Sequence, residues 1–163
     1  MLTPNPEFIQ ELIHIVNTSP YPRHMSMRLA AIDIDRADIE LETGPQHIQP
    51  YGIVHGGVLA TLIDTATFWA AFMRIPEDAG LVNIDLKLNY LKPVISGRLK
   101  AEGRSIRSGN SISYAEARVL DTDGELIAHG TSTLMTLPDK GLRMKARKFT
   151  DIIEDISQAL NES

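Results

Sequence analysis

The segment His55-Gly56-Gly57, followed by Asp64, contains the residue types that could do chemistry in this chain. Two glycines where a loop runs into a helix let a ligand approach the backbone closely. The first amide groups of a helix have no partner within it, so they could bind an anion or stabilise a developing oxyanion. A tight turn is the structural alternative for the two glycines.

Asp64 lies in the otherwise apolar run from Ile53 to Met73. Burial of a carboxylate costs free energy and raises its pKa unless the group is paired. A general base or nucleophile would explain an Asp there, and so would a buried polar anchor bonded to a Thr or Arg. A helix rises ~1.5 Å per residue, so Asp64 would share a face with Gly57 but lie about 10 Å along the axis. Joint action of the two on one atom requires an antiparallel helix from a second subunit, and hence a homodimer with shared active sites.

Hydrophobic periodicity and proline positions predict the elements around these residues. We expect helices at 6–17, 57–73 and about 150–161, and strands at 29–35, 37–43, 82–90, 97–107, 111–121 and 125–137. The helix at 57–73 is apolar on nearly every face and must be enclosed. The sequence therefore predicts one α+β domain over residues 1–163, in which an antiparallel sheet of about six strands wraps around a long central helix.

The composition excludes several classes of protein. The 163 residues include no cysteine, which rules out disulfides, thiolate metal sites and catalytic thiols, and the N-terminus resembles no export signal, so we expect a cytoplasmic protein. We expect no membrane span, because His55 and Asp64 interrupt the apolar run. No histidine pair has metal-ligand spacing, so no metal is predicted. The net charge of −5 argues against a nucleic-acid partner.

Three stretches of the sequence resemble one known family. They are Gln49-Pro50-Tyr51-Gly52-Ile53-Val54-His55-Gly56-Gly57, Asp64-Thr65-Ala66 and Asp85-Leu86-Lys87-Leu88-Asn89-Tyr90-Leu91-Lys92-Pro93. Together they resemble the hotdog-fold acyl-CoA thioesterases of the phenylacetic-acid-degradation (PaaI-like) type, over about residues 25–137. The resemblance implies the hotdog fold and a homodimer, and dimers of this family commonly pair into homotetramers.

The resemblance also implies roles for individual residues. The Gly57 amide would polarise the thioester carbonyl, and Asp64 of the other subunit would act as nucleophile or general base on water. His55 would lie beside the thioester. Gln49 stands where the family often has Asn, and Asn83 where it often has Ser or Thr; both amides can still donate and accept hydrogen bonds.

Further substrate contacts are predicted around these residues. Residues 87–148 contain twelve Lys and Arg against six Asp and Glu, a basic excess that suits the phosphates of coenzyme A (CoA). Arg104 and Arg107 are the predicted phosphate contacts, with a solvated strand face as the alternative. Gly56, Thr65 and Phe68 are predicted to line the acyl groove, with a plain core position as the more common alternative for Phe68.

The sequence thus predicts an acyl-CoA thioesterase that needs no cofactor, since CoA arrives as part of the substrate. The alternative is a non-catalytic acyl-CoA binding protein or sensor of the same fold, in which Gln49 and Asn83 leave the site slow. A hydratase acting on enoyl thioesters ranks behind both, because such enzymes use a different motif. The acyl group is not specified by any residue pattern.

Overall fold

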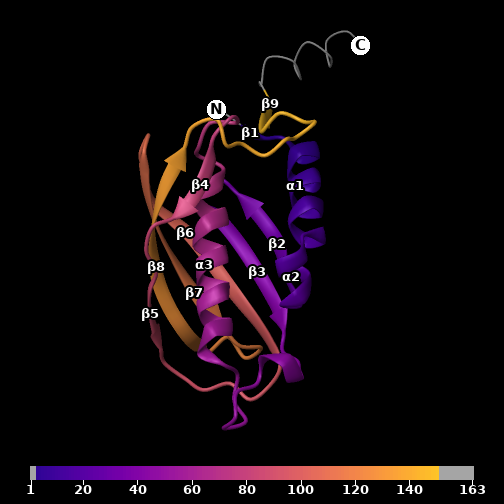
Figure 1. Cartoon of the computed structure of the whole chain (residues 1–163), viewed down its shortest axis with the longest axis vertical. Coiled ribbons are helices and arrows are strands. Elements are labelled where there is room, and N and C mark those ends of the chain that lie inside the picture. The colour runs from indigo at the N-terminus through magenta and orange to yellow at the C-terminus, as the bar shows by residue number, and fades with distance from the viewer. Residues whose placement is uncertain (1–2, 151–163) are drawn as a thin grey trace.

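A seven-stranded antiparallel sheet curls around helix α3 (Gly56–Phe72) in the computed structural model, which describes residues 3–150 (Figure 1). Its strands are β2 (Met27–Asp33), β3 (Arg36–Glu42), β4 (Gly80–Asn83), β5 (Lys87–Tyr90), β6 (Arg98–Ser108), β7 (Ile112–Leu120) and β8 (Leu126–Leu137). The strand order is β2-β3-β6-β7-β8-β4, and β5 also pairs with β8. The predicted α+β architecture is confirmed, with one strand more than expected.

Helix α3 forms the centre of the core. Leu62, Ile63, Ala66 and Ala70 are fully buried, and the helix packs mainly against β6, β7 and β3. A Cβ atom added to Gly103 on β6 would lie 2.2 Å from the Ala66 carbonyl oxygen, so only glycine lets this strand approach the helix so closely. The sheet face that Gly103 occupies is therefore the face that covers α3.

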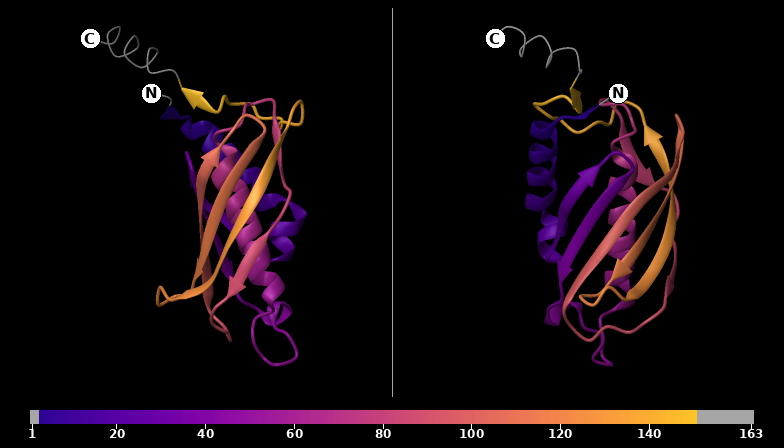
Figure 2. Two further views of the ribbon diagram at one scale, coloured as in Figure 1. Left: turned by 90° about the vertical axis from the view of Figure 1, so that its left-hand side faces the viewer. Right: turned by 180° about the vertical axis from the view of Figure 1, so that it is seen from behind.

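The N-terminal part of the chain lies against β2. Helix α1 (Pro6–Thr18) begins at Asn5, whose side chain accepts the Glu7 amide at 3.0 Å. Its buried residues Phe8, Leu12 and Val16 face the core, and the helix runs alongside β2 (Figures 1 and 2). A five-residue helix, α2 (Pro20–His24), follows in a segment for which no helix or strand was predicted. A single 3-10 turn, η1 (Pro45–His47), lies in the loop before α3.

The two ends of the described chain are joined. Strand β1 (Thr3–Pro4) pairs with β9 (Phe149–Thr150), and the Asn5 amide donates to the Lys148 carbonyl at 3.0 Å. We call β1, β9 and Lys148 the terminal clasp. The buried Lys148 ammonium donates to the carbonyl of Phe72, the last residue of α3, at 3.0 Å and to that of Ile75, three residues further on, at 2.8 Å. Apart from Thr150, the predicted terminal helix at about 150–161 lies outside the described residues.

The run 82–90, predicted as one strand, is two strands in the structure, and that prediction was wrong. The ladder is interrupted at Asp85, between β4 and β5. The Asp85 carboxylate accepts the Thr133 amide at 2.8 Å, and its carbonyl accepts the Ser132 hydroxyl at 2.6 Å. Side-chain hydrogen bonds to β8 thus replace the regular backbone pairing at this point.

Candidate active site

His55 caps the N-terminus of α3. Its Nδ1 accepts the Gly57 amide at 2.8 Å, and its carbonyl accepts the Val58 amide at 2.9 Å. The Gly57 amide, expected to be free, is therefore occupied by His55. The ring of Tyr90 on β5 lies against Gly56, 3.0 Å from where a Cβ atom would be. Both glycines leave room for a neighbouring side chain at the start of the helix.

The loop before α3 is held by His47. This buried imidazole accepts the Gly44 amide at Nδ1 (2.9 Å), and its Nε2 lies 2.9 Å from the Met25 carbonyl oxygen, an acceptor. The His47 carbonyl accepts the His55 amide at 2.8 Å. Gln49, which is half-buried, closes a turn in which its amide donates to the Ile53 carbonyl at 2.9 Å. The loop thus places Gln49 opposite Ile53 and His47 opposite His55, with Ile48 and Val54 paired between them.

Asp64 lies in the middle of α3, half-buried, next to the end of β4. Asn83 Nδ2 donates to Asp64 Oδ1 at 2.8 Å and lies 3.3 Å from the Asp64 carbonyl oxygen. Burial raises the pKa of Asp64, and the hydrogen bond from Asn83 partly opposes that rise. The carboxylate is thus more basic than an exposed Asp, as a general base requires.

Two neighbouring residues were missed in the sequence. Ser132 on β8 is buried, accepts Asn83 Nδ2 at 3.0 Å and donates to the Asp85 carbonyl at 2.6 Å. The alternation along β8 places Ser132 on the buried face, between Gly130 and Leu134. A serine at such a position was the signal that could have identified it. Tyr90 was quoted only as part of a motif, and its contact with Gly56 depends on how β5 is placed.

The predicted catalytic groups do not meet within one chain. Gly57 and Asp64 are seven residues apart on one helix, which the structure confirms as α3. Thr65 and Phe68 are half-buried on the following turn of the helix. Phe68 packs edge-on to Trp69, with ring centroids 4.8 Å apart, and stacks on Phe72 at 6.3 Å. The structure thus allows both predictions for Phe68, groove wall and core.

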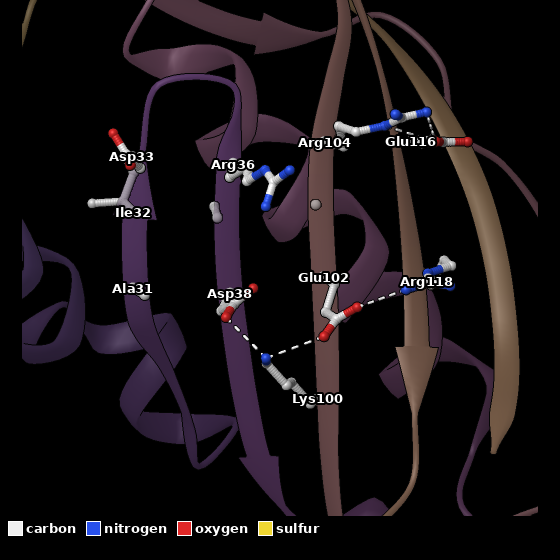
Figure 3. Close-up of a pocket in the computed structure, with 12 residues that line it drawn as sticks. Ala31, Ile32, Asp33, Arg36, Asp38, Lys100, Glu102, Arg104, Glu116 and Arg118 are labelled. Carbon is white, nitrogen blue, oxygen red and sulfur yellow. Dashed lines mark hydrogen bonds and ion pairs between the residues drawn. The ribbon is translucent and has the colours of Figure 1, made fainter. Parts of the chain in front are cut away.

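Arg104 and Arg107 lie away from this site. Gly103 faces α3, so Arg104 points to the outer face of the sheet, where it lines a surface cavity of about 800 Å³ (Figure 3). Its guanidinium donates to the Glu116 carboxylate at 2.8 Å. Arg107 is exposed near the end of β6 and forms no ion pair within residues 3–150. Their predicted contact with CoA phosphates stays a prediction.

No group of three or more His, Cys, Asp or Glu side chains between residues 3 and 150 is arranged to hold a metal ion. No helix in the same range is long and apolar enough to cross a membrane.

Comparison with known proteins shows the family. Residues 51–128 match the model of the thioesterase superfamily. A solved structure from that superfamily is 30% identical, covers 79% of this chain and 97% of its own, and has a TM-score of 0.70. A thioesterase of Haemophilus influenzae has the same fold, with a TM-score of 0.77, 22% identity, and coverage of 88% of this chain and 100% of its own. Mouse acyl-coenzyme A thioesterase 13 is 29% identical over 96 residues, which are 58% of this chain and 68% of that protein.

An antiparallel sheet wrapped around one long central helix is the hotdog fold. This chain belongs to the thioesterase superfamily of that fold and is a thioester hydrolase, as the sequence predicted.

Proposed function

We propose that this enzyme hydrolyses an acyl-CoA to the free acid and CoA, at a site shared between two subunits. The observation that carries the proposal is the half-buried Asp64 carboxylate, whose pKa is raised by burial and which accepts a hydrogen bond from Asn83 on β4. Asp64 lies on the same helix, α3, as the Gly57 amide. A carboxylate and a helix N-terminus are the two groups that addition of water to a thioester carbonyl needs. The similarity to an enzyme named for acyl-coenzyme A supports the substrate class.

Each group has a defined part in the reaction. The thioester oxygen takes the place of His55 Nδ1 at the Gly57 amide, which then stabilises the negative charge that develops on that oxygen. Asp64 of the other subunit removes a proton from the attacking water and passes it to the departing sulfur, or it attacks the carbonyl carbon itself and forms an anhydride that water then hydrolyses. Gln49 lies in the loop that leads into His55. In this mechanism its side-chain amide orients the carbonyl or the water. The bond that breaks is the carbonyl carbon to sulfur bond, and CoA leaves as the thiol.

The free edge of β4 supports a homodimer. Strand β4 ends the sheet order, and Val82 and Ile84 beside this edge expose 39% and 55% of their surfaces. Antiparallel pairing of two β4 strands about a two-fold axis would continue the sheet and bury these side chains. The same axis makes the two α3 helices antiparallel, so that Asp64 of each subunit approaches Gly57 of the other. A homotetramer would form from two such dimers.

Hydrolysis of an acyl-CoA panel tests this function. Aryl, short-chain and long-chain acyl-CoA substrates are incubated with the enzyme, and the released thiol is measured. We expect turnover of at least one acyl class and its loss, by about 100-fold or more, in Asp64→Asn. Binding of acyl-CoA without release of thiol would overturn the proposal and favour the non-catalytic binding protein. Near-full activity of Asp64→Asn would remove this carboxylate from the mechanism.

A further inference from the structure

We propose that Ser132 is a positioning residue, which orients the Asn83 amide so that its N–H groups face Asp64 and keep this carboxyl ionised. This inference rests on the proposed function of Asp64. The geometry that carries it is a chain of three hydrogen bonds that joins β8, β4 and α3. They run from Ser132 Oγ to the Asp85 carbonyl (2.6 Å), from Asn83 Nδ2 to Ser132 Oγ (3.0 Å) and from Asn83 Nδ2 to Asp64 Oδ1 (2.8 Å).

The number of protons available determines which group donates and which accepts in each of these three hydrogen bonds. A backbone carbonyl can only accept, so the single hydroxyl proton of Ser132 is committed to Asp85. Ser132 Oγ must therefore accept from its other neighbour, and only the NH₂ end of the Asn83 amide can donate. The second N–H of that group then points to Asp64.

The opposite orientation of Asn83 would have the opposite effect on Asp64. With its oxygen toward Asp64, the amide would repel the carboxylate and accept a hydrogen bond from the protonated acid. In the structure this orientation would also direct the Asn83 oxygen toward Ser132 Oγ, whose proton is already donated. Ser132 is fully buried, so no bulk water can replace its hydroxyl in selecting the orientation.

Among residues 3–150, no charged side chain donates a hydrogen bond to the Asp64 carboxylate in place of Asn83. The side chain nearest in sequence to Asn83 that carries a charge is Asp85, and its carboxylate accepts the Thr133 amide at 2.8 Å. Lys87 on β5 is exposed, and Thr67 on α3 donates to the Asp64 and Ile63 carbonyls rather than to the carboxylate. Burial and Asn83 alone displace the pKa of Asp64.

The test titrates the Asp64 carboxyl directly in Ser132→Ala. Carbon-13 NMR of Asp-labelled enzyme gives the ionisation of Asp64, assigned by the signal that Asp64→Asn removes. The acid limb of the kcat profile is measured on the same samples. We expect both midpoints to rise by about one pH unit, with near-normal kcat on the high-pH plateau. The NMR titration does not require turnover, so it separates failure of this inference from failure of the proposed function.

Ser113→Ala is the matched control. Ser113 is also a buried serine, on the neighbouring strand β7, but its hydroxyl has no hydrogen-bond partner among the described residues. Its loss should leave the Asp64 titration unchanged. In an Asn83→Ala background, Ser132→Ala should add no further shift, because the amide that it orients is gone. An unshifted titration in Ser132→Ala, an equal shift in Ser113→Ala, or a shift that persists without Asn83 would each overturn the proposal.

Discussion

Asn83 and Asp64 are joined by a hydrogen bond of 2.8 Å that links the last residue of β4 to the middle of α3. The bond lies at the free edge of the sheet, where the proposed second subunit pairs. One residue thus holds the carboxylate and belongs to the strand on which the proposed dimer would pair. In that dimer, placement of Asp64 and assembly of the shared site would depend on the same short strand.

Mixing two inactive variants tests whether the site is shared. Gly57→Val introduces a side chain at a position where even a Cβ atom would lie 2.8 Å from His55 Nδ1, so it should block the amide. Asp64→Asn removes the carboxylate. In a heterodimer of the two variants, one of the two sites combines an intact Gly57 with an intact Asp64. We expect subunit exchange to restore about one quarter of wild-type activity, the statistical share of intact sites. Absence of any recovery, in a mixture shown to exchange subunits, would contradict a shared site.

Asp64→Asn should make the protein more stable at neutral pH. Burial raises the folded-state pKa of Asp64 above its ordinary 3.8, so the ionised carboxylate opposes folding. Between the two pKa values the folded state binds more protons, and stability therefore falls as pH rises through that window. The variant escapes this loss and should melt a few degrees higher, about 2–4 °C at pH 7. Melting curves of both proteins from pH 3.5 to 8 should converge at the acid end; a constant difference would exclude ionisation as the cause.

Because of Lys148, the free energy of unfolding of the protein should increase as the pH rises above 8. Burial lowers the pKa of Lys148 from 10.5 to about 8, although Glu77 opposes this. The unfolded state then binds more protons between these two values, so the free energy of unfolding rises with pH there. The neutral amine still has two N–H groups for the Phe72 and Ile75 carbonyls.

Urea denaturation of wild type and Lys148→Met at pH 7.0, 8.5 and 9.5 measures this. The variant should be less stable by about 1–3 kcal/mol, because two buried carbonyls lose their donor, and should lack the wild-type increase above pH 8. Lys145→Met is the matched control, because the Lys145 side chain is exposed. Its backbone amide donates to Glu11 at 3.0 Å, and the substitution leaves this hydrogen bond in place. An equal pH dependence in Lys148→Met would assign the effect to another group.

His55 caps helix α3, and in the proposed mechanism it also lies beside the substrate; the two roles are separable. Asn is a strong N-cap residue, so His55→Asn should keep the melting temperature, whereas His55→Ala should lose about 1 kcal/mol of stability. Neither variant has an imidazole beside the thioester, and we expect kcat/KM to fall about tenfold in both. Thermal melting and steady-state kinetics on the three proteins measure the two effects. Wild-type kinetics in His55→Asn would limit the role of His55 to capping.

Local patterns were sufficient to predict most of the fold. The apolar run around Leu62 predicts a buried helix because nearly every face of it is apolar, Asp64 apart, and the helix ends one residue before the predicted boundary. The hairpin between β7 and β8 follows from its turn residues, with Gly124 at φ 79°. The break at Asp85 was missed because alternation continues through it, and only contacts with β8 reveal it. Distant contacts of this kind have no local signature.

Only part of the candidate site was predicted, because some of its residues are related by local geometry and others only by contacts between distant segments. Gly57 and Asp64 are separated by fixed helix geometry, so the sequence alone determines their spacing. Ser132 is 68 residues beyond Asp64 and joins it only through the pairing of β4 with β8. The capping of Gly57 by His55 could have been found, because a polar side chain just before a helix commonly accepts one of its first amides.

The terminal clasp has a consequence for the order in which the chain folds. Thr150 donates to the carbonyl of Thr3, 147 residues earlier, so this contact closes nearly the whole described chain into a loop. Closure of so long a loop loses more conformational entropy than closure of a shorter one. The two-residue strands β1 and β9 form few hydrogen bonds to offset this loss. The clasp should therefore form last during folding and open first in the native state. Each opening should withdraw Lys148 from the Phe72 and Ile75 carbonyls. We therefore expect the C-terminal turn of α3 to fray with the clasp, while the middle of the helix, where Asp64 lies, stays ordered.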